Sequence, residues 1–247
     1  RHVRSLSGTS DWRRSALDRM GTTVVLVAGT RRLPFASQPW TWPAIGPREL
    51  GARLGLPDLR VLGAAVPRQR DRQRLSLLVE APAADEAACP ASRRLAVVKL
   101  GRPDDGLSTE ALVLRLLTDR PLPAIATPRL ITAGTIEEGP EAPLAYVVTE
   151  PLGLGRQRPA IGEPLSTFEQ DLADRLARLP RPPGTPSEHV PVHGDLAPWN
   201  LRRTDRGLAL FDWEAAGWGP AGSDEAHYRA ACAALGSWIG SRFRSRR

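Results

Sequence analysis

The sequence predicts an α+β protein in two lobes, with a β-rich first lobe and a short helical second lobe. Three observations predict this arrangement. Strand-like segments dominate residues 58–149, whereas helices flank a polar loop in residues 150–247. In addition, residues with recognisable chemistry lie in both halves, among them the only lysine, Lys99, and the only asparagine, Asn200.

The first lobe is predicted to contain a sheet and one helix. Segments 59–66, 75–81 and 95–100 are rich in aliphatic residues, which is typical of strands that face a core. A helix is expected over 108–118, because leucines recur at helical spacing on one of its faces and a proline follows. A further strand is predicted at 145–149.

The second lobe is predicted to place a polar loop between two short strands, with helices on either side. Ser166 and Glu169 have the spacing of a capping box, which predicts a helix that Pro180 ends. The two short strands are expected at 190–193 and 208–213. A final helix then begins after a serine cap and carries acids in its first turn, where the helix dipole favours them.

Domain boundaries follow from these elements. Residues 1–57 give the fewest indications of structure, and we interpret them as an N-terminal extension or the remnant of an upstream module. A helix at 47–54 is expected within them, because proline stands at its first position and glycine just after its end. The remaining domain covers 58–247, with a first lobe at about 58–149 and a second at about 150–247.

The charge of the chain is uneven. It carries 34 basic and 27 acidic side chains, a net charge of +7, and all but one of the basic side chains are arginine. The excess lies at the two ends of the chain. Basic ends attract nucleic acid, anionic lipid or acidic partners. We expect these ends to form ordinary solvated surface, and we do not expect nucleic acid as a partner.

The composition also indicates the cellular compartment in which the protein is expected. No apolar run approaches the roughly 20 residues of a membrane span. Cys89 and Cys232 have neither metal-ligand spacing nor a disulfide framework, which is typical of reduced thiols. We therefore predict a cytoplasmic protein without a membrane span. The first residue is Arg1 rather than methionine, so we expect a fragment or a processed product.

Five residues have the chemistry and the order that phosphoryl transfer requires. Asp195 is the candidate base for an acceptor hydroxyl. Asn200 and Asp212 offer oxygen ligands, which Mg²⁺ prefers. Lys99 ends a predicted strand and supplies a compact ammonium for the α- and β-phosphates, which arginine does not replace. Glu110, near the start of the next helix, is expected to pair with Lys99.

These residues lie in a recognisable pattern. The run His-Gly-Asp-Leu-Ala-Pro-Trp-Asn at 193–200, followed by Leu-Phe-Asp-Trp-Glu at 210–214, resembles the aminoglycoside phosphotransferase and choline kinase superfamily. Members have a two-lobed protein-kinase-like fold and move the γ-phosphate of a nucleoside triphosphate to a small-molecule hydroxyl. The resemblance covers about 58–240 and implies the same roles for the five residues. It also implies that 146–152 meets the adenine and that Asp224 supports the catalytic loop.

We therefore predict an ATP-dependent phosphotransferase, or one that uses another nucleoside triphosphate, with Mg²⁺ as its metal. Its acceptor is expected to be a small hydroxylated molecule such as a sugar, an amino alcohol or an aminoglycoside-like compound. The acids that an acceptor pocket for a polycation requires are available from Glu163, Glu169, Asp171 and Asp174, although we favour a solvated helix face as their explanation.

Three alternatives remain open at this point. Because the second lobe is short, the first is a kinase-like nucleotide-binding module with little or no turnover. Another is a nucleic-acid or membrane-surface binder that uses the basic ends. A protein kinase is less favoured, because Gly194 stands where arginine is usual and Trp213 follows the predicted metal-binding aspartate where Phe-Gly is usual.

Overall fold

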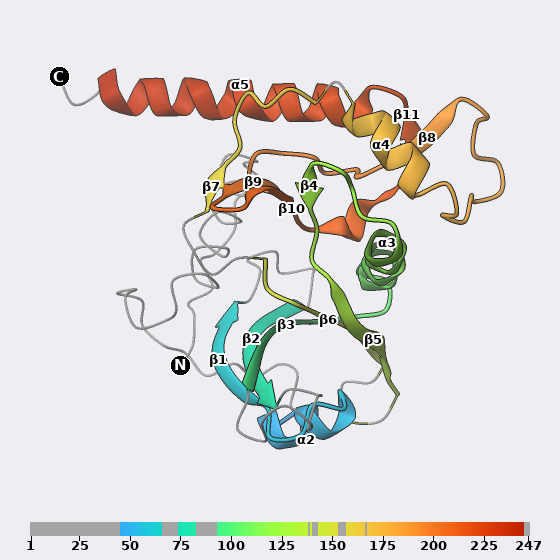
Figure 1. Ribbon diagram of the computed structural model, residues 1–247, viewed down its shortest axis with the longest axis vertical. Helices are drawn as coiled ribbons and strands as arrows, with labels where there is room; N and C mark the ends of the chain where they lie inside the picture. Colours follow the sequence, from blue (N-terminus) through green and yellow to red (C-terminus); the bar gives the residue numbers. More distant parts are fainter. Residues whose placement is uncertain are drawn as a thin grey trace. The chain divides into compact units, whose positions relative to one another are not determined.

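The structure is a computed structural model, and it describes residues 45–65, 74–82, 93–137, 139, 143–152, 157–165 and 167–244. Cys89 and Ser166 lie outside these residues. The chain divides into two compact units. The first unit comprises residues 1–111 and 129–154, and the second comprises residues 112–128 and 155–247. Figure 1 labels their elements.

An antiparallel five-stranded sheet forms the first unit, in the order β1-β2-β3-β6-β5. Alternate residues of β2 are fully buried, as expected for a strand with one face on a core. In β3, Lys99 pairs with Ser76 of β2 and with Val147 of β6, so it lies inside the sheet. The strands are β1 (Arg60–Ala65), β2 (Arg74–Pro82), β3 (Arg93–Gly101), β5 (Leu130–Ile136) and β6 (Leu144–Thr149). All but β5 confirm predicted strands.

Two helices accompany this sheet. Helix α2 (Pro47–Arg53) begins with proline, as predicted, and Gly55 follows it with a positive φ of 65°. Leu50 of α2 is fully buried in the same apolar cluster as β2 and β3. Helix α3 (Leu107–Asp119) confirms the second predicted helix. Residues of the predicted extension therefore help to build the core of the first unit, while the boundary at 57/58 remains a prediction.

The second unit combines two small sheets with two α-helices, one 3-10 helix and the part of α3 from residue 112 onward. One sheet has the order β4-β10-β9-β7, and the other pairs β11 with β8. The strands are β4 (Ile125–Ala126), β7 (Arg158–Pro159), β8 (His189–Val192), β9 (Leu201–Thr204), β10 (Gly207–Leu210) and β11 (Gly217–Pro220). The helices are α4 (Phe168–Arg175), the short 3-10 helix Trp213–Ala215, and α5 (Ser223–Arg244). The catalytic-loop motif lies between β8 and β9.

Two local predictions are wrong. The N-cap of α4 is Thr167, which makes no side-chain capping bond, and α4 ends at Arg175, before the predicted stop. Glu169 accepts a hydrogen bond from the Gly222 amide at 2.8 Å, so its carboxylate does not close a capping box. The strand predicted at 208–213 ends at Leu210, because a positive φ two residues later takes the backbone out of the extended region.

The described elements confirm the predicted fold class. The first unit is β-rich, and the second unit holds α4, α5 and the polar loop between β8 and β9. This is the predicted α+β arrangement, with two units of which the first is β-rich. Within the described ranges, no helix combines the length and the apolar character that crossing a bilayer demands.

We expect Leu50→Ala to lower the free energy of unfolding by about 2 to 4 kcal/mol, because a fully buried leucine leaves a cavity. Leu62→Ala is the matched control, since Leu62 is 37% exposed on β1, and its effect is expected to stay within about 1 kcal/mol. Urea unfolding of both variants measures the difference. Equal, small effects would show that α2 contributes nothing to the core.

Candidate active site

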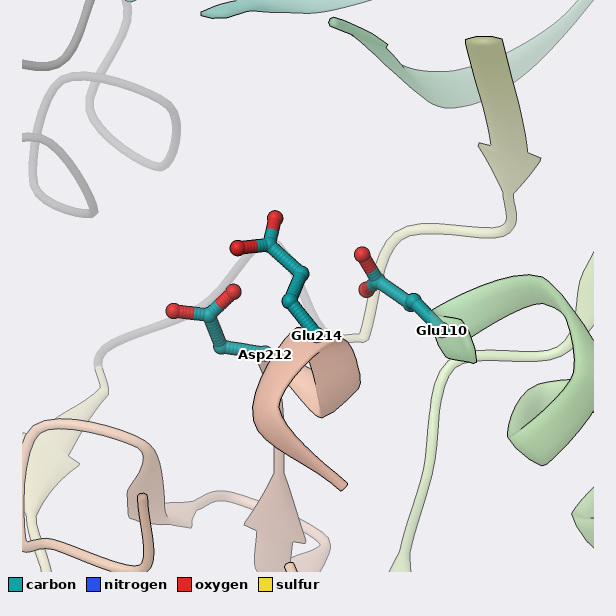
Figure 2. Close-up of side chains that lie close together, drawn as sticks. All are labelled: Glu110, Asp212 and Glu214. Atoms are coloured by element: carbon teal, nitrogen blue, oxygen red, sulfur yellow. The ribbon is translucent and has the colours of Figure 1, made fainter. Parts of the chain in front are cut away.

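The predicted pair in the first unit is present. The Lys99 ammonium donates to both carboxylate oxygens of Glu110, each at 2.8 Å. The Glu110 side chain is only 3% exposed and that of Lys99 is 23% exposed. A carboxylate this deeply buried requires a partner, and the ammonium on β3 supplies one. The pair thereby ties the middle of the sheet to the first turn of α3, from which Glu110 extends in Figure 2.

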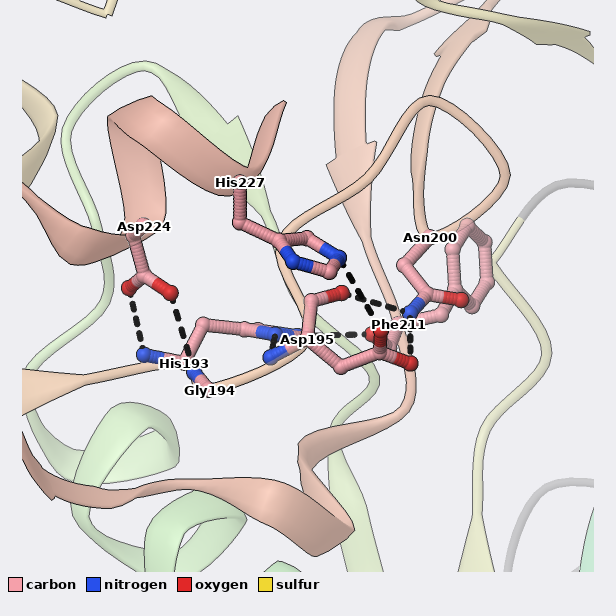
Figure 3. A network of polar contacts seen from close by, with 7 residues as sticks. All are labelled: His193, Gly194, Asp195, Asn200, Phe211, Asp224 and His227. Atoms are coloured by element: carbon pink, nitrogen blue, oxygen red, sulfur yellow. Dashed lines mark hydrogen bonds and ion pairs between the residues drawn. The ribbon is translucent and has the colours of Figure 1, made fainter. Parts of the chain in front are cut away.

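In the second unit, Asp224 fixes the start of the polar loop. Its carboxylate accepts the backbone amides of His193 and Gly194, at 2.6 and 2.9 Å (Figure 3). Asp224 is 2% exposed and lies in the first turn of α5, where the positive end of the helix dipole favours a carboxylate. The supporting role that the resemblance implies for Asp224 thus has a direct geometric basis.

Gly194 is required by the space around it as well as by its backbone. Its φ is +79°, and a Cβ at this position would lie 2.1 Å from the carbonyl oxygen of Ala215. No side chain fits at that distance. The glycine that distinguishes this loop from a protein-kinase loop therefore has a packing cause, because the last residue of the 3-10 helix lies directly against it.

His193 connects the loop to the strand end that precedes Asp212. Its Nε2 lies 2.9 Å from the Phe211 carbonyl oxygen, and its Nδ1 lies 3.3 Å from the Asp195 amide nitrogen. A carbonyl accepts and an amide donates, so these neighbours fit a neutral ring that is protonated at Nε2. Burial lowers the pKa of His193 below its ordinary value, although the nearby Asp224 opposes the shift. The ring also contacts Trp213, with centroids 4.6 Å apart.

Asn200 holds the candidate base. Its Nδ2 donates to the Asp195 backbone carbonyl at 2.8 Å and to the Asp195 Oδ2 at 3.1 Å. These two bonds identify Nδ2 as the amide atom facing Asp195, so Oδ1 is the atom that Asn200 presents on its other side. Asn200 is 5% exposed, and its own backbone is bonded to Ala197 and Phe211.

Asp212 occupies a backbone conformation that side-chain-bearing residues rarely adopt. Its φ and ψ are 65° and 66°, in the left-handed region, directly before the 3-10 helix. Aspartate tolerates this region better than most residues, and strained backbone of this kind concentrates at functional sites. One carboxylate oxygen of Asp212 lies within 4.8 Å of one from Glu214, and both side chains extend from the same turn in Figure 2.

The structure thus gathers the predicted residues in two sets. Lys99 and Glu110 form a direct ion pair in the first unit. Asp195 and Asn200 are in direct contact in the second unit. Asp212 follows Phe211, whose amide donates to the Asn200 carbonyl and whose carbonyl oxygen lies 2.9 Å from His193 Nε2.

Sequence reasoning missed one neighbour of the candidate base, His227. Its Nε2 lies 3.4 Å from the Asp195 Oδ1. The available signal was its position three residues after Asp224, which places both on one face of a helix.

Comparison with known proteins agrees with the motif. Residues 137–246 match the phosphotransferase enzyme family. The predicted resemblance is therefore confirmed over this segment. The matched phosphotransferase segment contains the loop, Asp212 and Asp224, while Lys99 and Glu110 lie before it. None of the curated proteins matches the chain.

Solved structures that resemble the chain are distant. One is a GDP complex of a variant aminoglycoside 2'-phosphotransferase, with 12% identity, a TM-score of 0.47, and coverage of 74% of this chain and 75% of that one. Another is an amicoumacin kinase in complex with AMP-PNP and Ca²⁺, with 12% identity and a TM-score of 0.39. The match covers 69% of this chain and 62% of the amicoumacin kinase. Neither likeness is near enough to assign an activity.

We expect Gly194→Ala to destabilise the protein far more than Gly222→Ala does. Both glycines have positive φ, at +79° and +81°, but a Cβ at Gly222 meets nothing within 4 Å. Gly222→Ala is therefore expected to cost only the backbone strain, about 1 to 2 kcal/mol, and Gly194→Ala adds the collision with Ala215. Thermal unfolding of both variants measures the difference, and equal midpoints would contradict the close approach.

We expect His193 to make the stability of the protein depend on pH. Its folded-state pKa lies below the ordinary 6.5, so the unfolded chain binds the proton more readily. The contribution of the neutral His193 ring to the free energy of unfolding is complete above about pH 6.5. It is lost as the pH falls through the folded-state pKa, and the free energy of unfolding then changes by up to about 1.4 kcal/mol per pH unit.

Urea unfolding between pH 7.5 and pH 5 of the unchanged chain and of His193→Gln measures this effect. The slope is expected to be flatter in the variant. The same substitution at His189, a partly buried histidine of β8, is the control. If His193→Gln leaves the slope unchanged, the neutral buried ring is not its source.

Proposed function

We propose that this protein transfers the γ-phosphate of ATP to a hydroxyl group of a small molecule, with Mg²⁺ as the metal. The observation that carries the proposal is the contact between Asp195 and Asn200 in a loop whose backbone Asp224 fixes. Phosphoryl transfer depends on positioning more than on covalent chemistry. A carboxylate held on one side by an amide, in a loop fixed by a buried acid, meets that requirement.

Asp195 is the proposed base. The acceptor hydroxyl donates its hydrogen bond to the Asp195 carboxylate, and its proton passes to that carboxylate as the new bond between acceptor oxygen and phosphorus forms. The bond between the γ-phosphorus and the bridging oxygen breaks, and ADP leaves with the electron pair. The Asp195 side chain is 23% exposed, so an acceptor is able to reach it from solvent.

The donor set suits a hard divalent cation. Asn200 presents Oδ1 on the side away from Asp195, and Asp212 and Glu214 add carboxylate oxygens from one turn. Oxygen ligands of this kind are those that Mg²⁺ prefers. We propose Asn200 and Asp212 as the metal-binding residues, and a bound Mg²⁺ would neutralise charge on the phosphates. We add Glu214, from the same turn, as a proposed supporting acid.

Lys99 and Glu110 are the proposed phosphate-positioning pair. Glu110 fixes the ammonium with two bonds of equal length, which leaves it little freedom to turn away. A fixed compact cation suits the α- and β-phosphates of a nucleotide, whereas the broad planar guanidinium of arginine does not. A chain that uses arginine at all its other basic positions supports this role for its one lysine.

Three of the four acids considered for a polycationic acceptor are already engaged within the second unit, and the Asp174 carboxylate accepts from Gln170. Glu163 forms an ion pair with Arg203, and Glu169 accepts the Gly222 amide. This engagement favours a neutral hydroxylated acceptor over an aminoglycoside-like polycation.

The test is a screen for ATP consumption with Mg²⁺ against sugars, amino alcohols and aminoglycosides. We expect acceptor-dependent turnover in the unchanged chain and a loss of about 10²-fold or more in kcat for Asp195→Asn, because the base is removed while its shape is kept. Binding of Mg·ATP by the variant is expected to remain.

Asp205→Asn is the matched control, since Asp205 is an exposed aspartate in the turn between β9 and β10. It is expected to keep full turnover. Bound Mg·ATP without turnover for any acceptor would exclude the kinase and favour the nucleotide-binding module, in which the same loop holds nucleotide without transferring its phosphate.

A further inference from the structure

The two oxygens of the Asp195 carboxylate have different neighbours. Oδ2 accepts from the Asn200 amide at 3.1 Å, whereas Oδ1 lies 3.4 Å from Nε2 of His227 (Figure 3). The Asn200 bond faces the interior, because Asn200 is 5% exposed. The His227 side is open to water, since that side chain is 48% exposed. An acceptor from solvent therefore meets the base on the Oδ1 side, next to the imidazole.

Helix α5 positions His227 through the same turn that fixes the loop. Asp224 and His227 are three residues apart, so both side chains face the catalytic loop. Asp224 bonds the backbone at His193 and Gly194, and His227 reaches the side chain of the following residue. The position of the imidazole relative to Asp195 is thus set by a rigid helical turn whose first contact is buried.

The hydrogen-bonding capacity of the imidazole limits what fits beside it. Nε2 of His227 faces the Asp195 carboxylate. In the tautomer that donates to Oδ1, Nε2 carries a hydrogen, and the charged ring carries one there as well. A hydroxyl group accepts from such an N–H. An ammonium group has donors and no acceptor, so it cannot take the same place.

We propose that His227 is a specificity-determining residue that selects acceptors with a second hydroxyl next to the reacting one. The reacting hydroxyl donates to Asp195 Oδ1, and its neighbour accepts from the His227 Nε2–H, which is then shared between that hydroxyl oxygen and Oδ1. A polyol satisfies both contacts, whereas an amino alcohol, with an ammonium in the second place, loses one contact and meets a donor. This inference rests on the proposed phosphotransferase function and narrows its acceptor class to neutral polyols.

The test compares a polyol with the amino alcohol of the same carbon skeleton, using kcat/KM for each. The unchanged chain is expected to prefer the polyol. His227→Ala is expected to lower kcat/KM for the polyol about five- to tenfold, the value of one hydrogen bond, and to leave KM for ATP unchanged. His227→Gln, which keeps an N–H donor, is expected to restore part of the preference.

Arg229→Ala is the matched control. Arg229 lies on the same helix, and its guanidinium bonds Glu225 on the exposed surface. Arg229→Ala is expected to leave kcat/KM unchanged for both the polyol and the amino alcohol. If His227→Ala behaves like Arg229→Ala while the unchanged chain turns over, the inference on His227 is overturned and the phosphotransferase remains. Absence of turnover in the unchanged chain with every acceptor would overturn both.

A structural readout tests the contact without turnover. At fixed pH, Asp195→Asn is expected to shift the ring resonance of His227 in NMR spectra and to leave that of His189 in place. No shift at His227 would show that the imidazole and the carboxylate do not interact in solution, which also overturns the inference.

Discussion

The buried carboxylate of Asp224 is the contact on which the second unit depends. It accepts two consecutive backbone amides, of His193 and Gly194, where the chain leaves β8. Buried amides without acceptors are costly, and a charged acceptor makes stronger bonds than a neutral one. With both amides satisfied, the backbone turns through a left-handed glycine, and the residue that follows presents its side chain to solvent. The orientation of Asp195 is therefore fixed by a helix, α5, that begins about thirty residues later in the chain.

A second set of contacts joins the catalytic loop to the turn that carries Asp212. The neutral ring of His193 bonds the Phe211 carbonyl on one side and the Asp195 amide on the other, and Trp213 covers it. Phe211 in turn donates its amide to the Asn200 carbonyl. Loop and turn are thus connected by the His193 ring and by a backbone hydrogen bond.

The sequence predicted the parts of this structure that local patterns encode. Most strands and helices follow from apolar spacing and from proline and glycine at helix ends, and the pairing of Lys99 with Glu110 follows from their order. The failures are non-local. Glu169 bonds an amide 53 residues away instead of capping its own helix. Likewise, the collision that reserves position 194 for glycine involves a carbonyl about twenty residues later, which no spacing rule contains. Strand β5 was missed because small and polar residues interrupt its apolar pattern.

The environment of Asn200 also affects how readily its side chain deamidates. Asparagine side chains deamidate when the next backbone nitrogen attacks the amide carbon, and asparagine is for this reason a thermolabile residue. Here the attacking nitrogen would be that of Leu201, which is buried and donates to the Ala197 carbonyl at 2.7 Å. Conversion to aspartate would replace the Nδ2 donor with an oxygen facing two other oxygens of Asp195. The fold thus shields Asn200 from a spontaneous reaction that would place like charges beside the candidate base.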